Sequence, residues 1–322
     1  MNLRRRTVLS LLAGAAAGPS IAFADTFPSR PIHLVVGFTP GAASDIIGRL
    51  FAQGATPLVG QEIVVENKPG AGSLIAAQYV AHAAKDGYTL FLPALSTLTN
   101  VIINPLATVD IGRDFAPIAL LAIGTVVLVV NPASNVHSVA ELIALAKAKP
   151  GQVLYGSTGL GSLPQLAAEM FAQRAGVKLT HVPYPGSPQI AQDLLAGRIT
   201  MSFTIASSVI GQIAAGQIIA LATAATKRPA ALPNVPTMAE AGMPDFDTGL
   251  WLGLAAPAGA PRSAIEKIAA VASKAMHTPQ TVESLRKQGY DPLEAGPDAF
   301  AEFLRKENTR WTAVARAAGM KS

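Results

Sequence analysis

Two short stretches of small and polar residues hold the groups that could bind an anion. The first runs from Gly37 to Asp45 (GFTPGAASD) and the second from Gly156 to Ser162 (GSTGLGS). Each follows an apolar run that predicts a buried strand and precedes apolar residues at helical spacing. The first amides of a helix lack intrahelical acceptors, and the helix dipole adds partial positive charge there. Both stretches therefore predict an anion-binding helix N-terminus.

The chemistry of these stretches suits a carboxylate. Backbone amides and hydroxyl groups bind carboxylate oxygens with directionality, and each charge-assisted hydrogen bond contributes about 1.5–3 kcal/mol. Several such bonds support micromolar binding, which corresponds to about −8 kcal/mol. Ser44 and Asp45 are the predicted caps of the first helix. The alternative is that the glycines only allow each helix to pack on its strand, as they do in many α/β proteins.

Enzymatic interpretations find less support in the residues. The sequence contains no G-K-[ST] and no G-x-S-x-G motif, which argues against a P-loop NTPase and a nucleophile elbow. The five histidines are dispersed, without metal-ligand spacing, and none lies in either stretch. An exported hydrolase or isomerase that uses Asp45 or a loop serine stays as the rival hypothesis, against which the missing histidine partner argues. No metal or cofactor is expected.

The surrounding elements predict two α/β lobes. Strands are expected over 32–36, 62–66 and 88–92 with a helix over 74–84, and this order favours a parallel sheet with its ligand crevice at the carboxyl ends of the strands. A polar loop is expected from Ser96 to Asn100. The apolar passage 115–130 is long enough to leave one lobe and enter another, where a second α/β unit spans 152–223.

The chain is expected to return to the first lobe as a strand over 249–256. The remainder is predicted to be helical, with a capping box formed by Ser263 and Glu266. Because the chain is expected to cross between the lobes twice, we predict two lobes that close on a ligand about a hinge. The predicted boundaries are an export signal over 1–24, a first lobe over 25–121 and 254–322, and a second lobe over 122–253.

Composition limits the cellular context. Half of the 322 residues are hydrophobic and 14% are charged, so a sizeable core is expected. Of the net charge of +5, Arg4, Arg5 and Arg6 contribute three, and no basic run suggests nucleic acid. These arginines, an apolar stretch and the A-x-A site ending at Ala24 predict export to the periplasm, by either the general or the twin-arginine route. The absence of cysteine excludes disulfides.

The chain is similar to the substrate-binding proteins of tripartite tricarboxylate transporters, the Bug family of periplasmic receptors. The resemblance covers nearly the whole chain after the signal. It rests on the motifs FPSRPI (27–32), VVGFTPGA (35–42), ENKPGAG (66–72), DGYTL (86–90), YGSTGLGS (155–162), HVPY (181–184), DLLAG (193–197), LPNVPTMAEAG (232–242) and APAG (256–259).

The resemblance implies a type II periplasmic-binding-protein fold whose lobes close on a small organic acid, a dicarboxylate, tricarboxylate or aromatic acid, and deliver it to a membrane permease. We expect a monomer without catalysis. A ligand-sensing subunit of a membrane signalling protein would share the fold and stays as a further alternative. Carried onto matching positions, the ligand-binding residues would be Phe38, Thr39, Gly41, Ala42, Ser44, Asp45, Ser157, Thr158, Gly159, Gly161 and Ser162, with Ser96, Thr97, Pro183 and Tyr184 as weaker candidates.

Two positions depart from the family pattern. Ala42 stands where a second glycine is common, which narrows the freedom of that turn. Thr204 stands where an aspartate is common, and a threonine does not demand an amino group on the ligand. We therefore expect a ligand without an ammonium group, such as a plain dicarboxylate or an aromatic acid.

Overall fold

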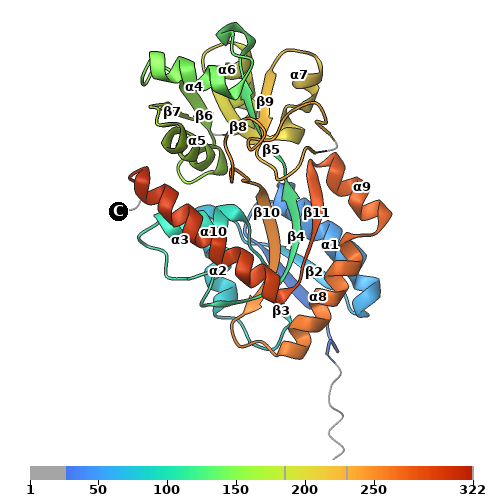
Figure 1. Cartoon of the computed structure of the whole chain (residues 1–322). Helices are drawn as coiled ribbons and strands as arrows, with labels where there is room; N and C mark the ends of the chain where they lie inside the picture. Colours follow the sequence, from blue (N-terminus) through green and yellow to red (C-terminus); the bar gives the residue numbers. More distant parts are fainter. Residues whose placement is uncertain (1–26, 185, 230, 321–322) are drawn as a thin grey trace, which may run out of the picture.

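A computed structural model describes residues 27–184, 186–229 and 231–320, so the predicted export signal lies outside the described residues. The chain forms two lobes, each built on one mixed sheet with helices on both sides (Figure 1). This arrangement confirms the prediction of two α/β lobes.

The six-stranded sheet of the first lobe has the strand order β11-β4-β10-β3-β1-β2. Its parallel part is β1 with β2 and β3, as predicted, whereas β10 runs antiparallel to both β3 and β4. The strands are β1 (Ile32–Val36), β2 (Ile63–Asn67), β3 (Thr89–Leu92), β4 (Phe115–Gly124), β10 (Leu250–Pro257) and β11 (Tyr290–Ala295).

Helices cover both faces of this sheet because its strands are apolar on both sides. Leu34 and Val36 pack in one core cluster with α1 and α8, while Val35 packs in another with α2, α3 and α10. The helices are α1 (Ala43–Val59), α2 (Leu74–Ala81), α3 (Leu95–Ile103), α8 (Arg262–Met276), α9 (Pro279–Lys287) and α10 (Pro297–Ala317), with a 3₁₀ turn η1 (Ala71–Ser73).

The five-stranded sheet of the second lobe has the strand order β7-β6-β8-β5-β9. Its strands are β5 (Val126–Val130), β6 (Leu154–Ser157), β7 (Thr180–Pro183), β8 (Met201–Ile205) and β9 (Ile219–Thr223). Its helices are α4 (Val139–Ala148), α5 (Leu163–Ala175), α6 (Ser187–Leu195) and α7 (Ile210–Ala214), with 3₁₀ turns η2 (Pro132–Ser134) and η3 (Ala206–Ser208).

Two crossovers join the lobes. The first is abrupt, because β4 ends at Gly124 in one sheet and β5 begins at Val126 in the other. The second is the return into β10, which starts at Leu250. The passages 115–130 and 249–256 thus change lobes as predicted, and the residue-level boundaries at 121/122 and 253/254 stay a prediction.

A buried carboxylate ties α10 to the second crossover. Glu307 accepts hydrogen bonds from the indole nitrogens of Trp251 on β10 (3.0 Å) and Trp311 on α10 (2.9 Å). Arg310, on the same helix, bonds Glu307 and also Asp247, which precedes β10. Burial raises the pKa of Glu307 and outweighs the opposing effect of these donors.

Four local predictions are wrong. Residues 96–100, expected to be a polar loop, lie in α3, and the supposedly helical remainder contains strand β11. The N-cap of α8 is Pro261, so Ser263 lies inside the helix and forms no capping box. The N-cap of α1 is Ala42, so neither Ser44 nor Asp45 occupies the cap position. Among the described helices, none is long and apolar enough to cross a membrane.

Candidate functional site

The predicted turn of the first lobe is held together by Asp45. Its carboxylate accepts hydrogen bonds from the Gly41 amide (2.9 Å), the Arg49 guanidinium (3.0 Å) and the Asn67 amide (2.9 Å). Asn67 also donates to the carbonyl oxygen of Phe38. Burial by itself raises the pKa of Asp45, but these three donors outweigh it and leave the pKa below its ordinary value. Asp45 is therefore a buried, charged support of this turn.

The other predicted residues of this turn lie around that support. Thr39 and Gly41 are exposed, Phe38 and Ala42 are partly buried, and Ser44 is buried in the first turn of α1. The neighbouring η1 turn packs closely against Gly37. A Cβ atom added to Gly37 would lie only 1.8 Å from the Ser73 hydroxyl oxygen, so this position has no room for a side chain. That hydroxyl is buried and has no hydrogen-bond partner among the described residues.

The turn of the second lobe contains several backbone amides, some of which are not used in hydrogen bonds within the turn. Ser157 is fully buried and its hydroxyl accepts the Gly159 amide at 3.1 Å, while the Ser162 hydroxyl donates to the Gly159 carbonyl at 2.7 Å. Gln165 accepts the Gly161 amide. Within the described ranges, the amides of Thr158, Leu160 and Leu163 have no acceptor. This turn and the start of α5 thus offer donors to a ligand.

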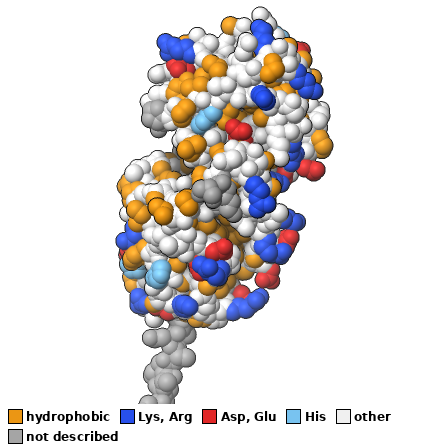
Figure 2. Space-filling view, turned by 90° about the vertical axis from the view of Figure 1, so that its left-hand side faces the viewer, with side chains coloured by type: hydrophobic (Ala, Val, Ile, Leu, Met, Phe, Trp, Pro, Cys, Tyr) orange, Lys and Arg blue, Asp and Glu red, His pale blue; other side chains and the backbone are white. Residues whose placement is uncertain are grey.

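A cavity of about 200 Å³ lies between the lobes beside this turn. Residues of both lobes line it: Ser96, Val126, Thr158, Ser162, Leu163, Pro164, Ser187, Phe203, Thr204, Ile205 and Leu250. Ser96 stands in the first turn of α3, and Ser162 is the N-cap of α5. The N-terminal turns of two helices, one from each lobe, therefore face the same cavity. The space-filling view shows the molecule narrowing between the lobes (Figure 2).

Direct contacts between the lobes border this cavity. The Thr99 hydroxyl on α3 donates to the Gly161 carbonyl oxygen at 2.9 Å. A Cβ on Gly161, whose φ is +72°, would lie 2.2 Å from the Cδ1 atom of Ile103. The second-lobe turn therefore packs on α3 through a glycine that leaves no room for a side chain.

The structure brings four predicted residues to the cavity, namely Ser96, Thr158, Ser162 and Thr204. Residues 38–45 do not line it. Thr97 is buried, and its hydroxyl accepts the Ala94 amide, so its role is to cap α3. Pro183 is exposed on β7, and the Tyr184 hydroxyl donates to Asp193 at 2.8 Å.

Ser157 has a histidine partner that the sequence did not indicate. The Nε2 atom of His181 lies 2.6 Å from the Ser157 hydroxyl, and the imidazole stacks on Tyr155 with 5.0 Å between ring centres. Burial lowers the pKa of His181, and the negative charge of Glu169 opposes this only in part. The histidine partner that was inferred to be missing is therefore present beside Ser157, although no histidine lies within either turn. The cause is topological, because parallel pairing sets His181 on β7 beside Tyr155 on β6.

Sequence reasoning also missed Asn67, Ser187 and Phe203. Asn67 stands in the ENKPG motif at the end of β2, where a polar residue could have been expected to reach the neighbouring turn. Ser187 begins α6, and its position just before Pro188 is a helix-start signal.

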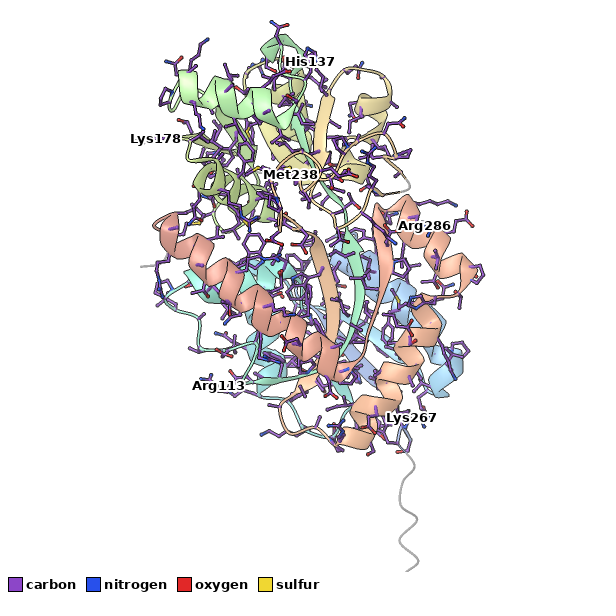
Figure 3. The ribbon with its side chains drawn as sticks, viewed as in Figure 1. Arg113, His137, Lys178, Met238, Lys267 and Arg286 are labelled. Carbon is purple, nitrogen blue, oxygen red and sulfur yellow. The ribbon has the colours of Figure 1, made fainter. Side chains whose placement is uncertain are left out.

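Among the described residues, no charged side chain lines this cavity. The labelled side chains of Arg113, Lys178 and Lys267 lie on the periphery of the lobes, and His137 lies at the far end of the second lobe (Figure 3). In the described part of the chain, no group of three histidine or acidic side chains could hold a metal ion.

The family model described as "Tripartite tricarboxylate transporter family receptor" matches residues 47–320. A Pseudomonas sp. protein from the tcbD-tcbE intergenic region is 37% identical over 96% of this chain and 93% of its own length. Protein BugT of Bordetella pertussis is 34% identical over 100% of this chain and 99% of its own.

Solved structures agree with these relatives. Rpa4515 of R. palustris with adipate has a TM-score of 0.77 and 33% identity, and the match covers 91% of this chain and 98% of that chain. MatC from Rhodopseudomonas palustris with bound malate has a TM-score of 0.73 and 30% identity, over 89% of this chain and 99% of that chain.

Proposed function

Because the chain belongs to the tripartite tricarboxylate transporter receptor family, we propose that it binds a small organic acid between its lobes in the periplasm. The observation that carries this proposal is the cavity onto which the first turns of α3 and α5 both face. Lobe closure would bring these turns together on one carboxylate, and a membrane permease would receive the acid.

The donors around the cavity suit a carboxylate. The amides of Thr158 and Leu163, which have no acceptor among the described residues, and the positive end of α5 favour an anion without requiring a buried cation. The solved relatives with adipate and malate support a carboxylate as the common ligand group.

Thermal unfolding with a panel of organic acids tests the proposal. A ligand at 100 times its Kd stabilises a protein by about 2.7 kcal/mol, so a bound acid should raise Tm by several degrees. Ser162→Ala and Ser96→Ala should each weaken binding about tenfold, whereas Ser284→Ala on the exposed face of α9 should not. A panel in which no acid raises Tm would refute the receptor proposal.

The Ser157–His181 pair supports a second candidate, an exported hydrolase. Three features favour the receptor. Ser157 is fully buried, its hydroxyl is bonded to Gly159, and no carboxylate among the described residues bonds the Nδ1 atom of His181. We expect no turnover of nitrophenyl esters by the purified protein. Turnover that is lost in Ser157→Ala would establish the hydrolase instead. A pull-down from membranes would distinguish a permease from a signalling partner.

A further inference from the structure

The described residues that line the cavity between the lobes include no charged side chain. Of its lining residues, Ser96, Thr158, Ser162, Ser187 and Thr204 carry hydroxyl groups, and the others are apolar, namely Val126, Leu163, Pro164, Phe203, Ile205 and Leu250. The largest of these, Phe203, is fully buried and stacks on Phe246 with 5.5 Å between ring centres, so this wall is rigid. The cavity can therefore hold an apolar group but offers no ion-pair partner to a second charge.

The hydroxyl of Thr204 has a fixed direction of hydrogen bonding. Ser208 donates its proton to the carbonyl oxygen of Ile205 at 2.7 Å. The 3.1 Å contact between the Thr204 and Ser208 hydroxyl oxygens must then use the proton of Thr204. Thr204 consequently has only lone pairs to offer to a ligand, although its own side chain is uncharged.

Because the Thr204 hydroxyl can only accept hydrogen bonds, it disfavours a ligand carboxylate beside it. A carboxylate beside Thr204 would meet an acceptor and lose its hydration without gaining a donor. An ammonium group would find an acceptor but no negative charge to balance it in the cavity. A hydrocarbon end of the ligand would pack against the apolar wall and would give up no hydrogen bond to water.

We propose, on the basis of the receptor function above, that the ligand is a monocarboxylic acid with an uncharged and largely apolar body, and that Thr204 is a specificity-determining residue. The carboxylate lies at the turns of α3 and α5, and the body extends along Phe203 and Leu250. The volume of about 200 Å³ suits a small acid, because sites for drug-sized ligands measure about 300–1,000 Å³.

Calorimetric titration of two matched series tests this class. The aliphatic series is hexanoate, adipate and 6-aminohexanoate, and the aromatic series is 4-ethylbenzoate, terephthalate and 4-(aminomethyl)benzoate. Within each series the shape changes little, so the distal group decides affinity. We expect the monoacid of at least one series to bind at least tenfold more tightly than its diacid and its amino acid.

Variants test the role of Thr204. Ser208→Ala removes the acceptor that holds the Thr204 proton, so Thr204 can donate and the preference for monoacid over diacid should fall at least threefold. Ser208 does not line the cavity, so a merely steric role predicts no such change. Thr204→Val should keep the monoacid affinity within threefold, and Ser284→Ala should leave the ratio unchanged.

The outcomes separate this inference from the receptor proposal. If an acid binds but neither series shows a tenfold preference for the monoacid over its diacid and its amino acid, the ligand class is overturned and the receptor function still stands. A ratio unaffected in Ser208→Ala would overturn the role of Thr204. If none of the six compounds and no acid of the wider panel bound, both proposals would fall.

Discussion

The carboxylate of Asp45 is fully engaged by its own lobe, with donors from Gly41, Arg49 and Asn67. It was a predicted ligand contact. The turn needs no glycine at position 42, because Ala42 has extended backbone with φ −68°. A carboxylate that supports a turn and a carboxylate that binds a ligand both act by accepting hydrogen bonds, so the same residue type suits either role. Spacing alone cannot tell them apart.

Replacing Asp45 by alanine should lower the free energy of unfolding by about 2–3 kcal/mol, because the Gly41 amide and the Asn67 side chain lose a charged acceptor. Urea denaturation measures the loss. Asp298→Ala is the matched control, since Asp298 also lies in the first turn of a helix but is exposed. A loss for Asp45→Ala no larger than that of the control would contradict the role given to Asp45.

His181 should make stability depend on pH near neutrality. Its pKa in the folded protein lies below the ordinary 6.5, because burial disfavours the imidazolium. Between these two pKa values the unfolded chain binds more protons, so stability should fall as pH drops below about 6.5. Urea denaturation at several pH values should show this slope flattened in His181→Gln but not in a variant of the exposed His277. An unchanged slope would show that His181 does not titrate in this way.

Among individual residues, the glycines and hydroxyls of the turns were predictable, because strand–turn–helix units leave a signal in composition. The Ser157–His181 pair was not, since 24 positions separate its members and only strand pairing joins them. Which hydroxyl of the cavity donates and which accepts also depends on neighbours several positions away.

At the scale of elements, α3 does two things that a polar loop could not. It places Ser96 at the cavity, and it packs Ile103 and Thr99 against the second-lobe turn. Ser, Thr and Asn are weak helix formers, which is why Ser96–Asn100 resembles a loop in sequence. Tertiary packing and the cap that Thr97 gives to Ala94 override that preference.

Strand β11 was hidden for a related reason. It contains Pro292 and two acidic residues, which are unusual in a strand interior. The strand is tolerated because it lies at the edge of the sheet and its register shifts between Pro292 and Ala295. Edge strands carry little of the apolar alternation from which strands are predicted.

Gly161→Ala should weaken acid binding at least tenfold, because the new Cβ would meet Ile103 and separate the second-lobe turn from α3. Titration calorimetry measures the change. Gly176→Ala controls for backbone strain alone, since Gly176 also has a positive φ but its Cβ would have no neighbour within 4 Å. Adding Ile103→Val should restore part of the affinity. Equal effects of Gly161→Ala and Gly176→Ala would show that the contact with α3 is unimportant.

At the scale of the molecule, a second contact joins the lobes on the side away from α3 and α5 (Figure 1). Ser207 of η3 donates to the Gln288 carbonyl oxygen at 2.9 Å, and the Thr125 amide donates to Gly289 at 3.3 Å. A Cβ on Gly289 would lie 2.5 Å from the Ser207 side chain. The crossovers run between this contact and the cavity. If the second lobe pivots about the crossovers, opening the contact at Gly289 should bring the second lobe closer to α3 at the cavity.

Gly289→Ala should act as a wedge that tilts the second lobe toward α3. We expect a smaller radius of gyration without ligand and a severalfold gain in acid affinity, because the competent state is more populated. Small-angle X-ray scattering measures the first and calorimetry the second. The remote Gly319→Ala is the control, since Gly319 also has a positive φ. A larger radius of gyration would show that the lobes do not pivot about the crossovers.

The pairing of both tryptophans with Glu307 also gives the protein an intrinsic optical probe. Trp251 and Trp311 are the two tryptophans of the sequence, and both are fully buried. Trp251 follows Leu250, which lines the cavity, directly in the chain. Any shift of the returning crossover would alter the hydrogen bond between an indole and the carboxylate, and hence the emission spectrum. Unlabelled protein should therefore report the kinetics of ligand capture by stopped-flow fluorescence.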